Sequence, residues 1–267
     1  MSEPSDSDLV PGEAPESASR SAPNGPGQST SEDRLMEIRG LLAAATHRLL
    51  GDTISVTDDD WRASSRLPGW SRGHVASHIA RQADALGRLV AWARTGERQL
   101  MYASDEQRDA EIDAGSGRSG LELQIDLDTS AGRLAEAFDA LDESSSWDNV
   151  VELRGGKQTA ARALPLARLG EVVLHHVDLD IGFAIGDVEP AVAGWLLEWS
   201  AFRLAGRADF PSVLLESESG SATHLGSPPG DEPRVIRGSA ADLLGWLTGR
   251  SGPERVRGAD GLALPPY

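Results

Sequence analysis

The sequence predicts a mostly α-helical protein, in which a four-helix bundle is followed by a smaller α/β domain. Four long segments carry apolar residues at steps of three and four, which is the spacing of an amphipathic helix. Beyond residue 187, short β-like runs appear between the helical segments. The chain of 267 residues is 39% hydrophobic and 25% charged, which is typical of a globular protein that buries a sizeable core.

Residues 1–30 are predicted to form a disordered tail. Pro, Gly and Ser make up half of this segment, and Leu9 and Val10 are its only large aliphatic residues. Such a composition cannot offset the entropy lost on ordering. The segment also lacks the basic and apolar regions of a signal peptide, and the chain has no run of 18 apolar residues. We therefore expect a cytoplasmic protein without a transmembrane helix.

The first bundle helix is predicted to follow Thr30. Thr30 and Asp33 have the spacing of a capping box, which satisfies free backbone N–H groups at a helix start. Gly51 and Asp52 are expected to end the helix. Its apolar stripe consists of Leu35, Ile38, Leu42, Ala45 and Leu49.

Three further helices complete the predicted bundle. Ser71 can cap the second, which runs to Thr95 and carries the apolar residues Val75, Ile79, Leu86 and Val90. A glycine- and serine-rich break at 115–120 follows a polar segment and precedes the third helix, expected over 121–141. The fourth is expected over 165–183, because Pro165 is tolerated in a first turn. Four such helices with moderate loops predict a bundle domain over 31–187.

The second domain is predicted over 188–267. One helix is expected over 192–205, and β-like runs follow at 212–216 and 234–236. Ser239 and Asp242 form another capping-box pair at the start of a helix over 240–248. We interpret this region as a small α/β domain packed on the bundle.

The charge and the cysteine content exclude several functions. With 25 Lys and Arg against 42 Asp and Glu, the formal net charge is −17, which argues against binding to nucleic acid or to an anionic membrane. The chain contains no cysteine, so it has no disulfide, no cysteine-ligated zinc and no cysteine nucleophile. If thiol chemistry occurs here, the sulfur must come from a small molecule.

Four of the six histidines fall in two clusters. His175 lies four residues after Glu171, a step that rotates about 40° and advances about 6 Å along a helix, so the two share a face. His176 is expected to point elsewhere. A facing helix can supply His74 or His78 as a third ligand, and two imidazoles with one carboxylate leave a position open on a tetrahedral zinc ion. Alternatively, the Glu–His pair only stabilises its helix surface.

Two motifs carry a resemblance to a known family. The segments LPGWSRGHVASHIARQADAL and GEVVLHHVDLDIGF resemble the mycothiol-dependent maleylpyruvate isomerase family, whose N-terminal domain is a DinB-like four-helix bundle. The resemblance implies that His78, Glu171 and His175 bind the metal and that His74 lines the site. It also implies a functional arginine in the second domain, for which Arg250 in GWLTGR is the best match.

Asp178 is a further candidate, because it lies three residues after His175 and can reach a ring N–H or the mouth of the site. Carboxylates near a ligating histidine often orient the imidazole. We therefore group Asp178 with His74 as a residue of the cofactor site.

The resemblance also implies a reaction. Zinc would hold the thiol of mycothiol as a thiolate, which adds to the cis double bond of maleylpyruvate. The resulting single bond rotates, and elimination gives the trans isomer, fumarylpyruvate. Arg250 would hold a substrate carboxylate. Two alternatives stay open: a mycothiol S-transferase that acts on another small-molecule electrophile, and a non-catalytic metal-binding module.

Overall fold

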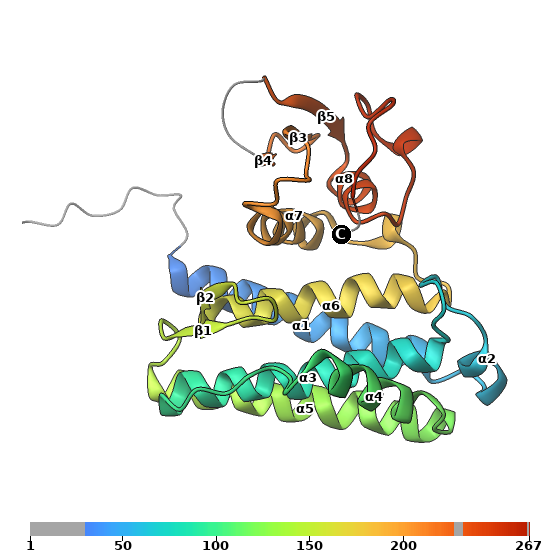
Figure 1. Cartoon of the computed structure of the whole chain (residues 1–267), viewed down its shortest axis with the longest axis vertical. Coiled ribbons are helices and arrows are strands. Elements are labelled where there is room, and N and C mark those ends of the chain that lie inside the picture. The colour runs from blue at the N-terminus through green and yellow to red at the C-terminus, as the bar shows by residue number, and fades with distance from the viewer. Residues whose placement is uncertain (1–29, 227–231, 266) are drawn as a thin grey trace, which may run out of the picture.

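The computed structural model describes residues 30–226, 232–265 and 267, so the predicted tail lies outside the described residues except for Thr30. The fold is mostly helical, as the sequence predicts. Four long helices form a bundle, and the C-terminal part of the chain packs on one side of it (Figure 1). The bundle helices are α1 (Ser31–Thr53), α3 (Arg72–Thr95), α5 (Gly120–Ser144) and α6 (Leu164–Leu179).

Local sequence sets the starts of these helices. Thr30 and Asp33 form the predicted capping box of α1, and Ser71 caps α3 by accepting a hydrogen bond from the backbone N–H of His74. Ser119 and Glu122 do the same for α5, and Pro165 lies in the first turn of α6.

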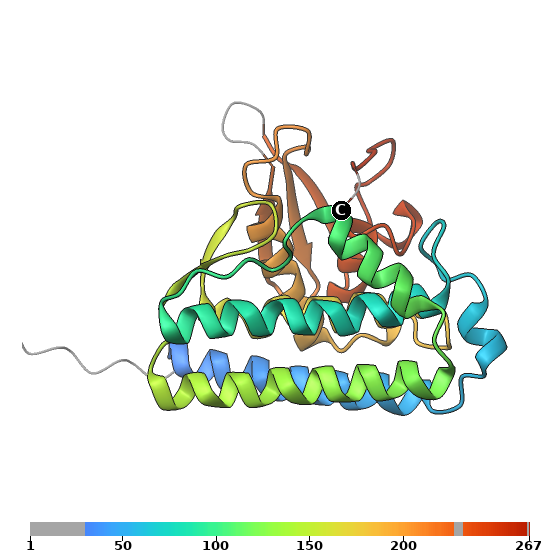
Figure 2. The same ribbon diagram turned by 60° about the horizontal axis from the view of Figure 1, so that its bottom comes forward.

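The bundle helices pack in the cyclic order α1, α6, α3, α5. Leu86, Leu89 and Phe138 are buried in the core at one end of the bundle, and Trp61 and Ile79 in the core at the other. Burial of these apolar side chains is the main favourable contribution to folding. Figure 2 shows α3 and α5 running side by side along the length of the bundle.

Shorter elements connect the bundle helices. None of them was predicted as regular structure: the helices α2 and α4, and a hairpin between α5 and α6. The helix α4 packs against α3, and the two hairpin strands pair antiparallel. The bounds of these elements are α2 (Asp58–Arg62), α4 (Asp105–Ser116), β1 (Val150–Glu152) and β2 (Gln158–Ala160).

The C-terminal part combines two helices with a three-stranded sheet. The strand order is β4-β3-β5, with β3 antiparallel to β4 and parallel to β5. The predicted strands and helices are present, and β4 is an addition. The bounds are α7 (Pro190–Leu204), β3 (Val213–Ser217), β4 (Ala222–Leu225), β5 (Arg234–Gly238) and α8 (Ala240–Leu247).

The helix α6 is the bundle helix that packs against the C-terminal part (Figure 1). Val172 and Leu179 belong to the bundle core, whereas Leu169 and Val173 belong to the core of the C-terminal part. The helix ends four residues earlier than expected, because Asp180 adopts a left-handed conformation with φ 54°. Within the described residues, no helix has both the length and the apolar composition needed to span a bilayer.

Candidate metal centre

Two bundle helices bring the three predicted metal ligands together. His78 extends from α3, and Glu171 and His175 extend from one face of α6. The Nε2 atom of His78 lies 3.1 Å from Glu171 Oε2 and 3.1 Å from His175 Nε2, and His175 Nε2 lies 3.3 Å from the same carboxylate oxygen. The three side chains are 8%, 24% and 16% exposed, so most of the cluster is shielded from water.

This donor set fits a divalent metal ion. Two imidazole nitrogens and one carboxylate oxygen converge within 4.8 Å of one another. Three protein ligands of these types are typical of zinc sites that keep one position open for a water or a substrate. The same arrangement would suit other divalent transition metals that accept imidazole ligands.

Electrostatics within the cluster favour charge on Glu171. Burial alone would oppose ionisation of this carboxyl group, but hydrogen bonds from His175 and His78 bring its pKa well below the usual value. Burial opposes protonation of His175 as well, yet its carboxylate partners Asp178 and Glu171 raise its pKa. For His78, burial prevails and lowers the pKa. The cluster therefore contains an ionised carboxylate and two imidazoles whose pKa values are shifted in opposite directions.

Asp178 orients His175. Its Oδ2 atom lies 2.8 Å from His175 Nδ1 and accepts that hydrogen bond, so the other ring nitrogen faces Glu171 and His78. Burial would raise the pKa of Asp178, but His175 and Arg250 lower it, so the group is a carboxylate at neutral pH. Its side chain is only 2% exposed.

Arg250 reaches the centre from the C-terminal part, just beyond α8. Its Nη2 atom donates to Asp178 Oδ2 at 2.5 Å, and the other donors bind the carbonyl groups of Leu174 and Thr248. A hydrogen-bonded chain thus runs from Arg250 through Asp178 to His175. Arg250 reaches the candidate ligand His175 through Asp178. The predicted catalytic role of Arg250 stays a prediction.

A buried arginine fixes the two ligand-bearing helices against each other. Arg168 lies one turn before Glu171 on α6 and donates to the carbonyl oxygen of Ile79 and to Gln82 Oε1 on α3, both at 2.7 Å. Burial lowers its pKa to about 10, so it stays charged at neutral pH. These bonds hold α6 beside the turn of α3 that carries His78. The sequence pattern gave no indication of this role, because a single arginine in an apolar stripe is ambiguous.

His74 is separated from the cluster. Its Nδ1 atom lies 2.7 Å from Ser71 Oγ and accepts the backbone N–H of Ser71, so its ring completes the cap of α3. Its ring stacks on Trp70, whose ring meets His78 edge-on at a centroid distance of 5.6 Å. The predicted role of His74 in binding a cofactor stays a prediction.

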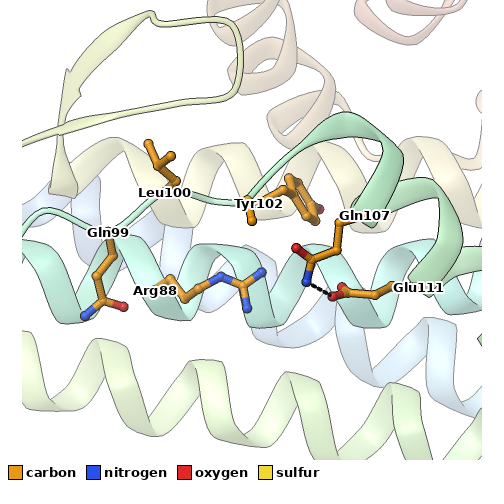
Figure 3. Close-up of a pocket in the computed structure, with 7 residues that line it drawn as sticks. Arg88, Gln99, Leu100, Tyr102, Gln107 and Glu111 are labelled. Atoms are coloured by element: carbon orange, nitrogen blue, oxygen red, sulfur yellow. Dashed lines mark hydrogen bonds between the residues drawn. The ribbon is translucent and has the colours of Figure 1, made fainter.

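Two residues beside the cluster were not predicted from the sequence. Arg108 Nη2 lies 3.3 Å from His78 Nδ1. Tyr102 lies near Glu171, and the pKa of Tyr102 is raised mainly by burial and further by the negative charge of Glu171. Both belong to the polar segment that lacks apolar periodicity, so spacing could not reveal them. Tyr102 also borders a cavity of about 420 Å³ between α3 and α4 (Figure 3), lined by Arg88, Gln99, Leu100, Tyr102, Ala103, Gln107 and Glu111.

His176 points away from the cluster, as its position on the helix predicts. Its ring is 2% exposed and stacks on Phe183 at a centroid distance of 4.3 Å. Its Nε2 atom lies 3.2 Å from Asp52 on α1. Burial lowers the pKa of His176 to about 4, although Asp52 partly opposes the shift. This histidine is neutral at pH 7 and belongs to the packing between α1 and α6.

His176 should make the fold sensitive to acid. In the unfolded chain the imidazole titrates near pH 6.5, whereas the folded protein takes up this proton only near pH 4, so stability is lost as the pH falls between these values. The pKa difference corresponds to about 3 kcal/mol. We expect the non-titrating variant His176→Gln to lose less stability than the wild-type protein over this range.

Urea unfolding of the metal-free proteins at pH 7.0, 5.5 and 4.0 measures the effect. His47→Gln is the matched control, because His47 is an exposed histidine on α1. If the pH dependence of wild-type protein and His176→Gln were parallel, the buried histidine would not be the source of acid sensitivity.

Comparisons with known proteins find a matching family and similar solved structures. The model of the family described as "Mycothiol maleylpyruvate isomerase N-terminal domain" matches residues 42–180, just over half of the chain, including His78, Glu171 and His175. A comparison with curated proteins finds no significant match.

Two solved structures are similar over most of the fold. They are the crystal structures of a mycothiol-dependent maleylpyruvate isomerase, 28% identical, and of its histidine-to-alanine mutant, 27% identical. Each alignment covers 90% of this chain and 100% of the other, with a TM-score of 0.78. Together with the matched domain, this similarity establishes the relationship: the chain belongs to the mycothiol maleylpyruvate isomerase N-terminal domain family.

Proposed function

We propose that this protein is a zinc-dependent enzyme that uses mycothiol to convert maleylpyruvate into fumarylpyruvate. The observation that carries the proposal is the convergence of His78, Glu171 and His175 from two adjacent helices. Membership of the family and the similarity to a solved mycothiol-dependent maleylpyruvate isomerase support the choice of reaction. Zinc held by these side chains would supply a Lewis acid that keeps a bound thiol ionised at neutral pH.

In this proposal the chain's own residues prepare the site. Asp178 holds the His175 ring so that Nε2 faces the other two donors, and Arg168 holds α6 against α3. Burial of His78, whose side chain is 8% exposed, limits the access of water to the cluster. Because the chain contains no cysteine, no side-chain thiolate competes with mycothiol for the site.

We propose that Arg250 is the catalytic arginine and that it acts through its positive charge. Its guanidinium lies beside Asp178, and it could turn toward a substrate carboxylate, for which its planar donors are suited. The proposed domains, a bundle over 31–187 and an α/β domain over 188–267, would then meet at the reaction site.

The test combines metal analysis with an isomerase assay. We expect about one zinc ion per chain, and turnover of maleylpyruvate that requires mycothiol and is absent when glutathione replaces it. Elemental analysis gives the stoichiometry, and the conversion is followed by absorbance and product chromatography.

The other outcomes would redirect the proposal. Stoichiometric zinc without isomerisation would favour a mycothiol S-transferase, to be tested with a panel of electrophiles. No zinc after reconstitution would contradict a metal-dependent reaction and favour a binding module.

A further inference from the structure

Arg108 is a cation held unusually close to a candidate metal ligand. It lies on α4, and its Nη2 atom is 3.3 Å from His78 Nδ1. Two glycines allow this approach. A Cβ atom on Gly115 would come within 2.2 Å of Ser77 Oγ, and one on Gly73 would come within 2.4 Å of the Ser116 carbonyl oxygen. The close contact of α4 with α3 therefore places Arg108 over His78.

Besides His78, the guanidinium of Arg108 contacts the side chain of Tyr102 and one carboxylate. Its side chain is 13% exposed, and its carboxylate partner is the neighbouring Asp109 at 2.6 Å, which is 62% exposed. An exposed ion pair of this kind contributes little stability. The rings of Trp70 and Tyr102 flank the guanidinium at 6.0 and 5.9 Å. The arginine is thus positioned by aromatic packing and by His78 more than by a buried counter-ion.

The contact with His78 is compatible with only one arrangement of the imidazole proton. Arginine has five N–H donors and no acceptor, so Nδ1 of His78 must accept the hydrogen bond from Arg108. The ring proton then lies on Nε2 and points to Glu171. If Nε2 instead binds a metal ion, a neutral imidazole carries its proton on Nδ1. Two donors then face each other, and the hydrogen bond between Arg108 and His78 is lost.

We propose that metal binding at His78 releases the guanidinium of Arg108, which then binds a carboxylate group of the ligand. The inference rests on the proposed metal site. It assigns to α4 an anion subsite that is available in the metal-loaded protein and blocked in the metal-free protein. Arg108 is thereby a substrate-binding residue, distinct from Arg250 on the other side of the cluster.

The surroundings of Arg108 suit an anionic ligand. Tyr102 and Gln107 are its neighbours and line the cavity of about 420 Å³ (Figure 3). Burial and the charge of Glu171 raise the pKa of Tyr102, so its hydroxyl group keeps its proton and can donate. Arg88, the cation that lines this cavity, already directs two donors to the Met101 carbonyl group. Arg108 lies beside the cavity, against the ring of Tyr102, and is the cation that would lose a neutral partner when metal binds.

Zinc affinity tests the release directly and without an activity assay. Removing the competing donor with Arg108→Met should tighten zinc binding about tenfold, which is the value of one hydrogen bond to a charged group. Arg108→Gln should tighten it at least as much, because the amide oxygen can accept the Nδ1–H of His78. The control Arg133→Met removes an exposed arginine paired with Asp84 and should change the affinity less than about twofold.

Binding of maleate, a small dicarboxylate, tests the anion subsite. At constant ionic strength, Arg108→Met should weaken maleate binding about tenfold in zinc-loaded protein. In metal-free protein the same substitution should have little effect, because Arg108 is still engaged with His78. Calorimetry on both forms of each variant gives the four affinities.

The outcomes separate this inference from the proposed function. Wild-type protein that binds no zinc would contradict both. Zinc binding that is equally tight in wild-type protein and Arg108→Met would overturn the release alone, and the metal site would stand. A loss of maleate affinity that is equal in the two forms would also overturn it, because the subsite would not depend on metal.

Discussion

Replacing His78 with alanine is expected to lower zinc affinity by more than about 100-fold, since loss of a mere hydrogen-bond partner of a ligand already costs 10–100-fold. His78 supplies the only candidate ligand atom that α3 contributes to the cluster of described residues. Without it, Glu171 and His175 remain on a single helix face. Two ligands at this spacing do not complete the three-ligand set of a zinc centre.

Competition with a chromophoric chelator measures the loss, and elemental analysis gives the residual metal content. The matched control is His47→Ala, which removes an exposed histidine from α1 and should bind zinc like the wild-type protein. Equal zinc affinity in His78→Ala and His47→Ala would show that the cluster on α3 and α6 is not the metal site.

Replacing Asp178 with alanine is expected to destabilise the metal-free protein by about 3–5 kcal/mol, because a buried arginine loses its carboxylate partner. The side chains of Arg250 and Asp178 are 11% and 2% exposed, so water cannot easily replace the lost contact. The same substitution frees the His175 ring and should lower zinc affinity about 10–100-fold. The expected loss of about 3–5 kcal/mol is a large part of the unfolding free energy of an ordinary domain.

A double variant separates the two effects. Asp178→Ala/Arg250→Met removes the unpaired charge, so most of the stability should return, whereas zinc affinity should stay low because His175 still lacks its acceptor. Urea denaturation and chelator competition measure the two quantities on the same samples. If Asp178→Ala changed neither, the chain from Arg250 to His175 would have no structural or ligand-orienting role.

The bundle could be predicted because its determinants are local. The capping boxes at Thr30 and Ser71 specify where α1 and α3 begin, and the apolar stripe that follows each of them specifies which face is buried. The hairpin formed by β1 and β2 could not be predicted in this way. Each strand has three residues, too few to show alternation, and its pairing depends on contacts across the turn.

The same distinction applies to the site. The spacing of Glu171 and His175 follows from helix geometry alone, and the structure places both on one face. Spacing could not choose between His74 and His78, because that choice depends on how far along α3 the helix α6 crosses. The contacts of Arg168 and Arg108 depend on helix packing, so a single sequence gives no local signal for them.

The two-sided burial of α6 limits where this chain can accept substitutions. Core packing on both sides leaves few positions of α6 that can change volume without a cost in stability. The candidate ligands Glu171 and His175 are surrounded by these tightly packed positions. The loop before α4 and α4 itself pack mainly on α3 and border the cavity near Tyr102. Substitutions in this peripheral layer can therefore reshape the cavity while the helix that carries Glu171 and His175 keeps its packing.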